Sequence, residues 1–485
     1  MLPPLLKERK RLFFALAVFI SFVFSIAYST LAIVRHNHFQ SFGYDLGIND
    51  QTVWRYSRFE APVTTIDPFP DRSKLYEHVE LVYALISPIY WIWNTRRMLL
   101  LFTSLFVCVG AIPIYLLARN RKLSYKHSFA ILFSYLAFFG IQNAIWFDVH
   151  SVCYGTTFLA FLFYFLETKK NKTAFIFFIL AVTSKENFAF ITFFIALIYF
   201  IRWKNKFSIL LMACSLVYSV FIFFIYFPYI IHFPYLYANK DGLLSNLNPL
   251  SFFNTTEKLV TLFYTFFSFG FLPILTPLAF IPAAADLATY FMIGSDLPGA
   301  QGLYMHYRIT LAPLLAWATI LTLSKYKFLR SNYVAIYLIF CTLLVQYTLH
   351  LPLSYLSKEW FWKESKSVKN IQDVIREYLP ENASVAAQNN IVPHISHRDK
   401  IYSVYPTKKH FDKNSPCGKP DCNWMVWYDS PEFLLVDTSN DWDIRHLLAN
   451  HEDFVDGLKN LEKESVITKN KDENTTRLYR VNKKP

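Results

Sequence analysis

The chain has 485 residues, of which 54% are hydrophobic and 17% are charged. The charged share lies below the roughly 25% of ordinary soluble domains, and the apolar share excludes a disordered chain. Apolar residues form blocks such as 13–31, 98–117 and 209–230. Each block is close to the ~20 residues that a helix needs to cross a bilayer. The composition therefore predicts a multi-pass membrane protein and argues against a soluble globule.

The net charge of +13 has two explanations, nucleic-acid binding or the sidedness of short membrane loops. Its distribution favours the second. Seventeen Lys and Arg against two acidic residues lie in segments 1–12, 119–126, 167–172, 202–206 and 325–330. Segment 34–81 holds five basic and seven acidic residues. By the positive-inside rule, the first set is predicted to be cytoplasmic and the second to lie outside.

The first apolar run follows basic residues, as in a signal peptide. It is longer than a typical signal-peptide core, and no small-residue cleavage site follows it. We therefore expect a retained first span at about 13–33 and a large outer loop at 34–98. Within this loop, Val79–Trp93 is too short and too interrupted by proline to span. We expect it to form a helix on the membrane surface.

The segment Thr173–Ile201 lies between two basic loops, so it must cross the membrane and return. It is shorter than the ~40 residues of two full spans and is interrupted at 183–187 by Thr-Ser-Lys-Glu-Asn. The pattern predicts two short helices that meet inside the protein, with their break at a polar cavity. Further spans are expected near 99–118, 128–147, 152–167, 207–230, 257–270, 271–292, 307–324 and 332–350. This gives about eleven crossings, with the C-terminus outside.

Composition changes at about residue 358. Residues 358–485 hold 20 Lys and Arg and 20 Asp and Glu, a balanced soluble profile. Ser367–Tyr378 has helical spacing, whereas Ala383–Ala387, Ile401–Val404 and Phe433–Val436 are typical of short strands. We expect a mainly α protein with a membrane helix bundle at 1–357 and an extracytoplasmic α/β domain at 358–485. Cys417 and Cys422 in that domain are a candidate disulfide.

Polar residues that are costly near a membrane gather on the predicted outer side. They lie in the first outer loop, at the second outer turn, at the helix break and before a late span. They are Asp45, Asp50, Gln51, Trp54, His78, Asp148, His150, Lys185, Glu186, His306, Tyr307 and Arg308.

Each of these residues alone also has a structural explanation. Asp45 could cap the helix that follows it, and His78 could be an interfacial hydrogen-bonding residue. Arg308 could anchor a lipid headgroup, and Lys185 could neutralise Glu186. Their joint occurrence predicts more, because two cations suit a phosphate and a carboxylate suits a general base. The pattern therefore predicts a site for a phosphate-bearing lipid at the outer membrane face.

Short motifs follow in order along the chain: Tyr44–Gln51 with Trp54, His78 before Ser87–Tyr90, Phe147–His150, Ser184–Asn187, Phe271–Pro277, His306–Arg308, Ala383–Ala387 and Pro393–Arg398. Over nearly the whole chain they resemble domain-of-unknown-function family 2079, a group of predicted membrane proteins. The chain departs from the family pattern at Asn49, Ser151 and Asn187, where an aromatic residue, a proline and an acid are common.

Family 2079 is in turn similar to the GT-C superfamily of integral-membrane glycosyltransferases. These enzymes take a sugar from a polyprenyl-phosphate donor at the non-cytoplasmic face. The resemblance implies that Asp45 is the catalytic base and Asp148 a second acid. It implies that Lys185 and Arg308 hold the donor phosphate. The other residues of the cluster are expected to contact substrate: Asp50, Gln51, Trp54, His78, His150, Glu186, His306 and Tyr307.

Two other functions stay open at this point. A transporter or lipid flippase would use the break at 183–187 as a substrate site, and a sensor or scaffold would bind a partner through 358–485. The sequence has no P-loop and no Gly-x-Gly-x-x-Gly motif, which disfavours a nucleotide-sugar donor. The acceptor could be a glycan, a lipid or a protein. No cofactor is certain, and Asp45, Asp50 and Asp148 could supply ligands to a divalent metal.

Overall fold

The computed structural model describes residues 4–66, 72–232, 235, 248–293, 299–406, 425–426, 431–439 and 451–482. The candidate disulfide of Cys417 and Cys422 lies outside these residues. The chain packs as two compact units. The helical unit consists of Met1–Ala32, Leu75–Val82 and Leu100–Ser357, and the α/β unit of Ile33–Lys74, Tyr83–Leu99 and Lys358–Pro485.

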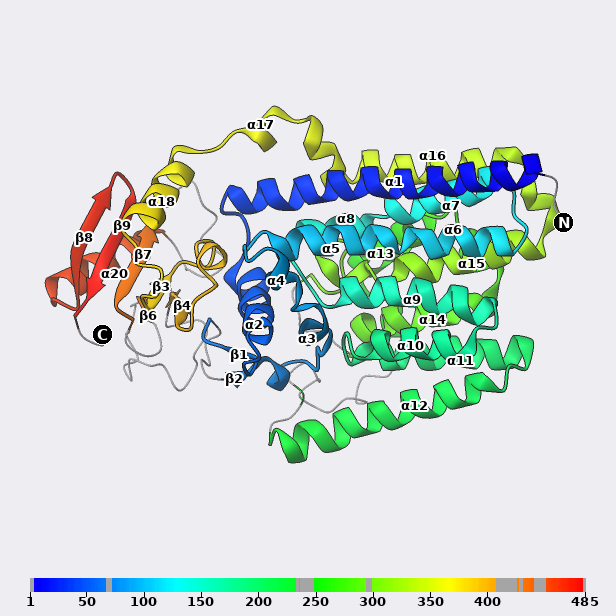
Figure 1. The fold of residues 1–485 in the computed structure, drawn as a ribbon, viewed down its shortest axis with the longest axis horizontal. Coiled ribbons are helices and arrows are strands. Elements are labelled where there is room, and N and C mark those ends of the chain that lie inside the picture. Colours follow the sequence, from blue (N-terminus) through cyan, green and yellow to red (C-terminus); the bar gives the residue numbers. More distant parts are fainter. Residues whose placement is uncertain are drawn as a thin grey trace. The chain divides into compact units, whose positions relative to one another are not determined.

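The helical unit is a bundle of apolar helices that run side by side (Figure 1). Its helices are α1 (Pro4–Asn37, to Ala32 in this unit), α5 (Met98–Val109, from Leu100), α6 (Ala111–Asn120), α7 (Tyr125–Leu136), α8 (Phe139–Trp146), α9 (Val152–Glu167), α10 (Asn171–Val182), α11 (Asn187–Trp203), α12 (Phe207–Phe221), α13 (Thr256–Phe267), α14 (Pro277–Ala288), α15 (Leu311–Lys325) and α16 (Asn332–Thr348). A π-helix, Ile222–Ile230, continues α12, and another, Thr289–Ile293, continues α14.

Five helical stretches in the described part of the chain are long and apolar enough to cross a membrane. They are Glu8–Asn37, Met98–Asn120, Tyr125–Trp146, Phe207–Ile230 and His306–Lys325. Shorter apolar helices occur at Val152–Glu167, Asn171–Val182, Asn187–Trp203, Pro277–Met292 and Asn332–Thr348. The predicted mainly helical, multi-pass architecture is therefore confirmed.

The predicted break near residue 185 is also confirmed. Helix α10 ends at Val182, and α11 begins at Asn187. The hydroxyl groups of Thr183 and Ser184 donate hydrogen bonds back to the carbonyl oxygens of Ile179 and Leu180, both at 2.8 Å. In a continuing helix the Leu180 carbonyl oxygen would accept from the Ser184 N–H, but that N–H donates to Ala181 O at 3.0 Å. The Ser184 hydroxyl takes its place, so the interruption leaves fewer polar groups unsatisfied in an apolar bundle.

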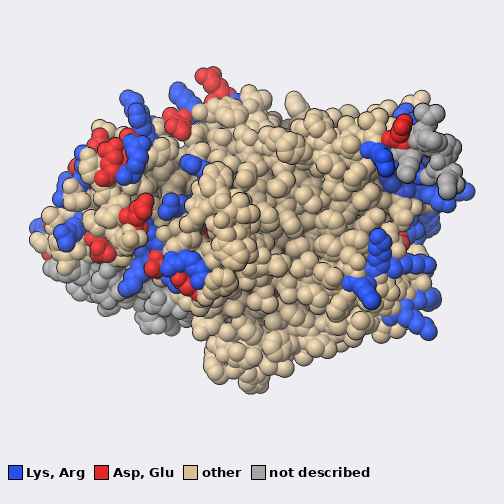
Figure 2. Space-filling model, in the orientation of Figure 1, with Lys and Arg blue, Asp and Glu red and all other residues tan. Residues whose placement is uncertain are grey.

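The basic loops of the helical unit meet at one end of the bundle. Arg121 pairs with Glu167, and His127 Nε2 lies 3.1 Å from the carbonyl oxygen of Ser331. Figure 2 shows Lys and Arg side chains gathered at the bundle end where α1 begins, while the long sides of the bundle carry little charge. The loops that the charge pattern groups together therefore share one end, and its cytoplasmic assignment stays a prediction.

The α/β unit is built on a five-stranded sheet of order β4-β3-β7-β9-β8. Its strands are β3 (Val385–Ala387), β4 (Ile401–Ser403), β7 (Phe433–Asp437), β8 (Ile467–Glu473) and β9 (Thr476–Val481). Strands β4, β3 and β7 are parallel, whereas β9 and β8 are antiparallel. Helix α18 (Lys366–Glu377) packs with one apolar cluster and α20 (His451–Lys463) with the other. Alternating side chains along β3 enter the two clusters, so each face of the sheet is covered.

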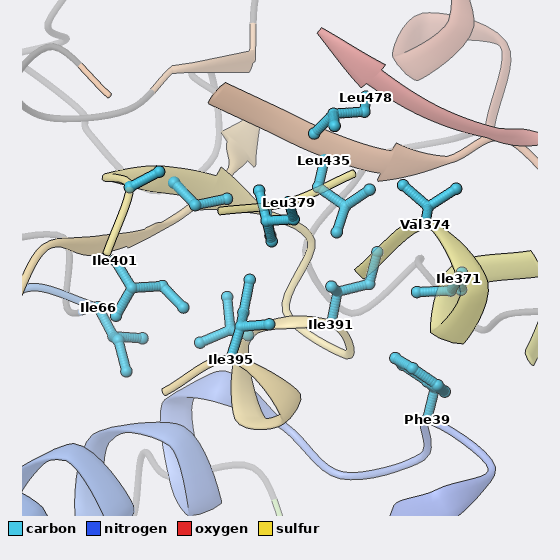
Figure 3. Packing of buried hydrophobic residues seen from close by; sticks show 14 of the residues in the cluster. Phe39, Ile66, Ile371, Val374, Leu379, Ile391, Ile395, Ile401, Leu435 and Leu478 are labelled. Carbon is cyan, nitrogen blue, oxygen red and sulfur yellow. The ribbon is translucent and has the colours of Figure 1, made fainter. Parts of the chain in front are cut away.

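The first outer loop contributes to the core of the α/β unit. Phe39, Ile48 and Ile66 are buried in the cluster that also holds Ile371 and Leu435 (Figure 3). The loop forms α2 (Ile48–Ser57) and two short strands, β1 (Val63–Thr64) and β2 (Arg72–Ser73). The sequence predicts that the outer loop 34–98 belongs to the membrane domain. In the structure most of this loop packs with residues 358–485, because its apolar side chains complete that core.

The segment expected to form one surface helix contains two short helices. They are α3 (Val82–Ile86) and α4 (Ile89–Ile92), separated by Ser87 and Pro88. Proline lacks the N–H group that would continue the first helix, which explains the interruption. The exposed side chains of Trp91, Ile92 and Trp93 suit the predicted position at a membrane surface.

Candidate functional site

Glu186 holds the segment before α3 against the break between α10 and α11. His78 Nδ1 lies 2.7 Å from Glu186 Oε1, and the Val79 N–H donates to Oε2 at 3.2 Å. Tyr235 also donates to Oε1, at 2.7 Å. Glu186 is 1% exposed. Because both oxygens accept bonds from the protein itself, Glu186 is placed to orient the His78 imidazole more directly than to bind substrate.

Two further bonds hold the same segment. Ser151 donates to Glu80 Oε1, and the Val82 N–H donates to the carbonyl oxygen of Thr183 at 3.1 Å. Ser151 stands where the family commonly has proline, and a proline has no hydroxyl group to donate. Ser151, which departs from the family pattern, therefore has a hydrogen-bond partner in Glu80.

The turn after α8 meets the 3₁₀-helix His306–Arg308. The imidazole rings of His150 and His306 stack with centroids 3.6 Å apart. Gly140 in α8 lets the 3₁₀-helix approach closely, because a Cβ atom there would lie 2.6 Å from the carbonyl oxygen of Arg308. Asp148 is buried in the same turn with a φ of 79°, in the left-handed region that non-glycine residues seldom occupy. The structure thus brings the two predicted histidines together beside Asp148.

Arg308 is fully buried. Its Nη2 donates to the carbonyl oxygen of Ala300, and its guanidinium carbon lies 4.7 Å from the ring centroid of Tyr290. Its Nε and Nη1 have no hydrogen-bond partner among the described residues. A buried guanidinium with two unused donor groups is suited to bind an anion. Tyr307, its neighbour, is half-buried and packs against the Tyr290 ring at 5.2 Å.

Two lysines near the predicted site differ sharply. Lys185 is half-buried, and in the part of the chain that the structure describes it makes no ion pair. Lys258, which the sequence did not single out, is buried and donates to Ser251 O at 2.7 Å, Asn254 Oδ1 at 2.9 Å and Phe291 O at 3.0 Å. Lys258 is therefore a structural cation, whereas the ammonium of Lys185 is available to a ligand.

The sequence reasoning missed one acid, Asp286 in α14. It is fully buried, and neither carboxylate oxygen has a hydrogen-bond partner within the described ranges. A signal was present, because Asp286 is an ionisable residue inside the apolar run Pro277–Ala288. It was overlooked because it lies within a span instead of at a predicted outer turn.

The remaining predicted residues belong to the α/β unit. Asp50 is fully buried there and accepts hydrogen bonds from Tyr90 and Ser396. His397 Nε2 lies 3.0 Å from Asp50 Oδ2. Burial raises the pKa of Asp50, but the nearby His397 and these hydrogen bonds outweigh it and hold the pKa below its usual value. Asp50 is therefore an ionised carboxylate that joins the first outer loop to the segment around Ser396.

Gln51 and Trp54 belong to the same junction. Gln51 Nε2 donates to the carbonyl oxygen of Arg398 at 2.9 Å, and its Oε1 accepts from the Thr65 N–H at 3.0 Å. The Trp54 indole stacks on the imidazole of His397 with centroids 5.5 Å apart. These contacts give both residues a structural role within the α/β unit.

Asp45 lies in a π-helical turn, Gly43–Gly47, and is half-buried. Asn389 holds the start of this turn. Its carbonyl oxygen accepts from the Gly43 N–H at 2.7 Å, and its side-chain Oδ1 accepts from the Tyr44 N–H at 3.1 Å. A Cβ atom at residue 43 would lie 3.0 Å from Val392 and 3.1 Å from Asn389 Oδ1. The turn that carries Asp45 is thus positioned by the domain at 358–485.

Comparison with known proteins identifies the family. The family model described as "Predicted membrane protein (DUF2079)" matches residues 35–445. The chain belongs to this family. No curated protein matches the chain in sequence.

The DUF2079 chain also has the fold of a solved membrane protein, ArnT from Cupriavidus metallidurans bound to undecaprenyl phosphate. The match has a TM-score of 0.60 and an identity of 11%, and it covers 96% of this chain and 97% of that chain. At this identity the match establishes the fold, so the GT-C-like architecture that the resemblance implied is confirmed.

A divalent metal was left open by the sequence of this DUF2079 protein. Across the described ranges, no group of three or more His, Cys, Asp or Glu residues is arranged to hold a metal ion. Asp50 in particular is already contacted by Tyr90, Ser396 and His397.

The Asp50 contacts predict a pH dependence of stability. Its folded-state pKa is lower than the unfolded value of about 3.9. The ionised carboxylate therefore stabilises the fold above about pH 4. This stabilisation is lost as the pH falls through the folded-state pKa. We expect Asp50→Asn to reduce stability at pH 7 by roughly 1–3 kcal/mol.

Thermal unfolding of wild type and variant in detergent measures this effect, and the difference should shrink between about pH 5 and pH 3. Asp373→Asn is the matched control, because among the described residues Asp373 forms an ion pair only with the exposed Arg376, at 2.7 Å. A difference between wild type and Asp50→Asn that is the same at every pH would contradict the assignment.

The Asn389 contacts predict local protection of the turn that carries Asp45. Asn389→Ala removes the side-chain acceptor for the Tyr44 N–H but keeps the backbone acceptor for Gly43. A hydrogen bond worth about 1 kcal/mol corresponds to roughly fivefold faster amide exchange at Tyr44. Hydrogen–deuterium exchange measures it. Asn390→Ala is the control, because the amide nitrogen of Asn390 has no partner among the described residues. Equal exchange in both variants would refute the role of Asn389.

Proposed function

We propose that this protein is a GT-C-type glycosyltransferase that moves a sugar from a polyprenyl-phosphate donor to an acceptor at the outer membrane face. The observation that carries the proposal is the fold shared with ArnT over 96% of the chain, in a structure that contains undecaprenyl phosphate. The buried cation Arg308, with two donor groups unused among the described residues, is the kind of residue that such a lipid requires.

The donor phosphate would be held by Arg308 and Lys185. Arg308 supplies Nε and Nη1, and Lys185 supplies an ammonium group next to the anchored Glu186. The phosphate gains negative charge as its bond to the sugar breaks. The positive charges of Arg308 and Lys185 would stabilise this leaving group, most strongly where water is excluded. The stacked imidazoles of His150 and His306, and His78 held by Glu186, would position the donor or hydrogen-bond the leaving oxygen.

Asp45 would act as the general base, with Asp148 as a second acid. The acceptor's oxygen or nitrogen attacks the anomeric carbon while Asp45 takes its proton. The bond between the anomeric carbon and the phosphate oxygen breaks, and the polyprenyl phosphate leaves with the electron pair. Direct displacement of this kind inverts the anomeric configuration. The domain at 358–485 would bind the acceptor, which is a glycan, a lipid or a protein.

The proposed topology follows from the charged loops. The bundle end that carries the basic loops and the Arg121–Glu167 pair would face the cytoplasm. The N-terminus would lie on the same side, and the polar cluster around Glu186 and Arg308 would open to the outside of the cell membrane.

The base assignment predicts that Asp45→Asn abolishes transfer. The amide keeps the size of the side chain but cannot accept the acceptor's proton, so turnover should fall by about 10²–10⁴-fold. The measurement is loss of a lipid-linked sugar from a polyprenyl lipid extract after addition of purified protein in nanodiscs. Asn49→Ala, a nearby change to a side chain without a proposed chemical role, is the control. Full activity of Asp45→Asn would remove Asp45 from the mechanism.

The phosphate assignment predicts weaker lipid binding when Arg308 is changed. Arg308→Gln should lower the affinity for undecaprenyl phosphate by about 10- to 100-fold, the effect of losing charge-assisted hydrogen bonds. Native mass spectrometry of nanodiscs measures bound lipid. Arg121→Gln is the matched control, because its guanidinium already pairs with Glu167.

Unchanged binding in Arg308→Gln would contradict the phosphate site. A separate labelling experiment tests the transporter alternative. If the Lys185→Cys variant is labelled chemically from both membrane faces and no assay shows sugar transfer, a transporter is favoured.

A further inference from the structure

Asp286 is the feature of the helical unit that the proposed chemistry leaves unexplained. Its side chain is fully buried, and among the described residues both oxygens lack a hydrogen-bond donor. Its own backbone is satisfied, since its carbonyl oxygen accepts from Thr289 Oγ1 at 2.6 Å. The unsatisfied part is therefore the carboxylate alone.

Two other buried acids of the same unit, Glu167 and Glu186, have hydrogen-bond donors from the chain. Glu167 pairs with Arg121 and accepts a hydrogen bond from Tyr199 at 3.1 Å. Glu186 accepts bonds from Tyr235 and the Val79 N–H. A buried carboxylate without such donors costs several kcal/mol. Asp286 thus stands apart from the acids that hold the bundle together, which points to a partner that is not part of the chain.

The buried guanidinium of Arg308 helps to explain the unsatisfied carboxylate of Asp286. Tyr290 connects the two residues, because it lies one helical turn after Asp286 along α14 and its π-helical continuation. The Arg308 guanidinium lies against the Tyr290 ring. Yet no direct ion pair joins Asp286 to Arg308 within the described residues, and each keeps two unused polar atoms. The three side chains therefore present both free acceptors and free donors in one apolar setting.

A ligand that satisfies this arrangement must offer both kinds of group. A phosphate offers acceptors to Arg308, but its negative charge would be repelled by the Asp286 carboxylate. Sugar hydroxyl groups are donors and would satisfy Asp286. A sugar linked to a lipid phosphate carries the hydroxyl donors and the phosphate acceptors within a few ångströms of each other. The lipid phosphate without its sugar carries only the acceptors.

We propose that Asp286 accepts hydrogen bonds from hydroxyl groups of the donor's sugar while Arg308 binds the phosphate next to it. The inference rests on the proposed function and extends it, because it assigns discrimination between the sugar-bearing lipid and the sugar-free lipid to one carboxylate. Asp286 would thereby favour binding of donor over the lipid product that remains after transfer.

The test measures binding, so it does not depend on turnover. Nanodiscs with the full chain are incubated with an equimolar mixture of undecaprenyl phosphate and its glucose-, mannose- and N-acetylglucosamine-bearing forms, and native mass spectrometry counts each bound lipid. We expect wild type to enrich at least one sugar-bearing form. Asp286→Asn should reduce that enrichment by about tenfold or more, with binding of undecaprenyl phosphate unchanged or stronger.

Three further variants make the result specific. Asp286→Glu keeps the charge and should retain part of the enrichment. Arg308→Gln should reduce binding of all the lipids alike. Glu167→Gln, which changes a buried acid already bound by Arg121 and Tyr199, should change none of them. Thermal unfolding of each variant confirms that the compared proteins are folded.

The outcomes separate the two levels of the argument. If wild type binds no polyprenyl phosphate at all, the proposed function itself fails. If wild type binds undecaprenyl phosphate but enriches no sugar-bearing form, or if Asp286→Asn changes all lipids equally, the sugar role of Asp286 is overturned and the phosphate site stands.

Discussion

Burial of the Glu186 carboxylate organises the polar end of the helical unit. The chain stops being helical between α10 and α11, and at that point one acid binds the imidazole of His78, the Val79 N–H and the Tyr235 hydroxyl. A carboxylate in an apolar bundle is costly unless its oxygens are satisfied, so loss of these partners would destabilise the break. The position of Lys185, which adjoins Glu186 in the chain, follows from this anchor.

The charged residues of the helical unit fall into two kinds that burial alone does not distinguish. Glu167, Glu186 and Lys258 are buried and have partners from the chain. Arg308 and Asp286 are equally buried but retain unused polar atoms among the described residues. The first kind stabilises the bundle, because each charged group is hydrogen-bonded by the chain. The second kind leaves part of its desolvation cost uncompensated, which is characteristic of groups that meet a ligand.

Residues of the Tyr44–Gln51 motif have a similar division of roles within the α/β unit. Asp50 and Gln51 are tied to the segment around Ser396 and Arg398, and Asn389 fixes the turn of Asp45. Asp50 and Asp45 are only five residues apart, and composition treats them alike. The structure separates them, because one carboxylate is enclosed by donors and the other lies half-buried on a turn. A domain distant in sequence thus supports the segment proposed to carry the base.

Sequence alone determined the membrane class, most span positions and the break at 183–187, because hydrophobic length and the cost of buried charge are properties of local composition. It also located strands β3, β4 and β7, whose apolar residues are buried. It missed β8, an edge strand of mainly polar residues whose pairing partner decides its structure. Tertiary structure alone decided that most of the first outer loop packs with residues 358–485. It also decided that the Asp286 carboxylate has no hydrogen-bond donor within the described part of the chain. Both depend on contacts between residues far apart in the chain, which no local pattern encodes.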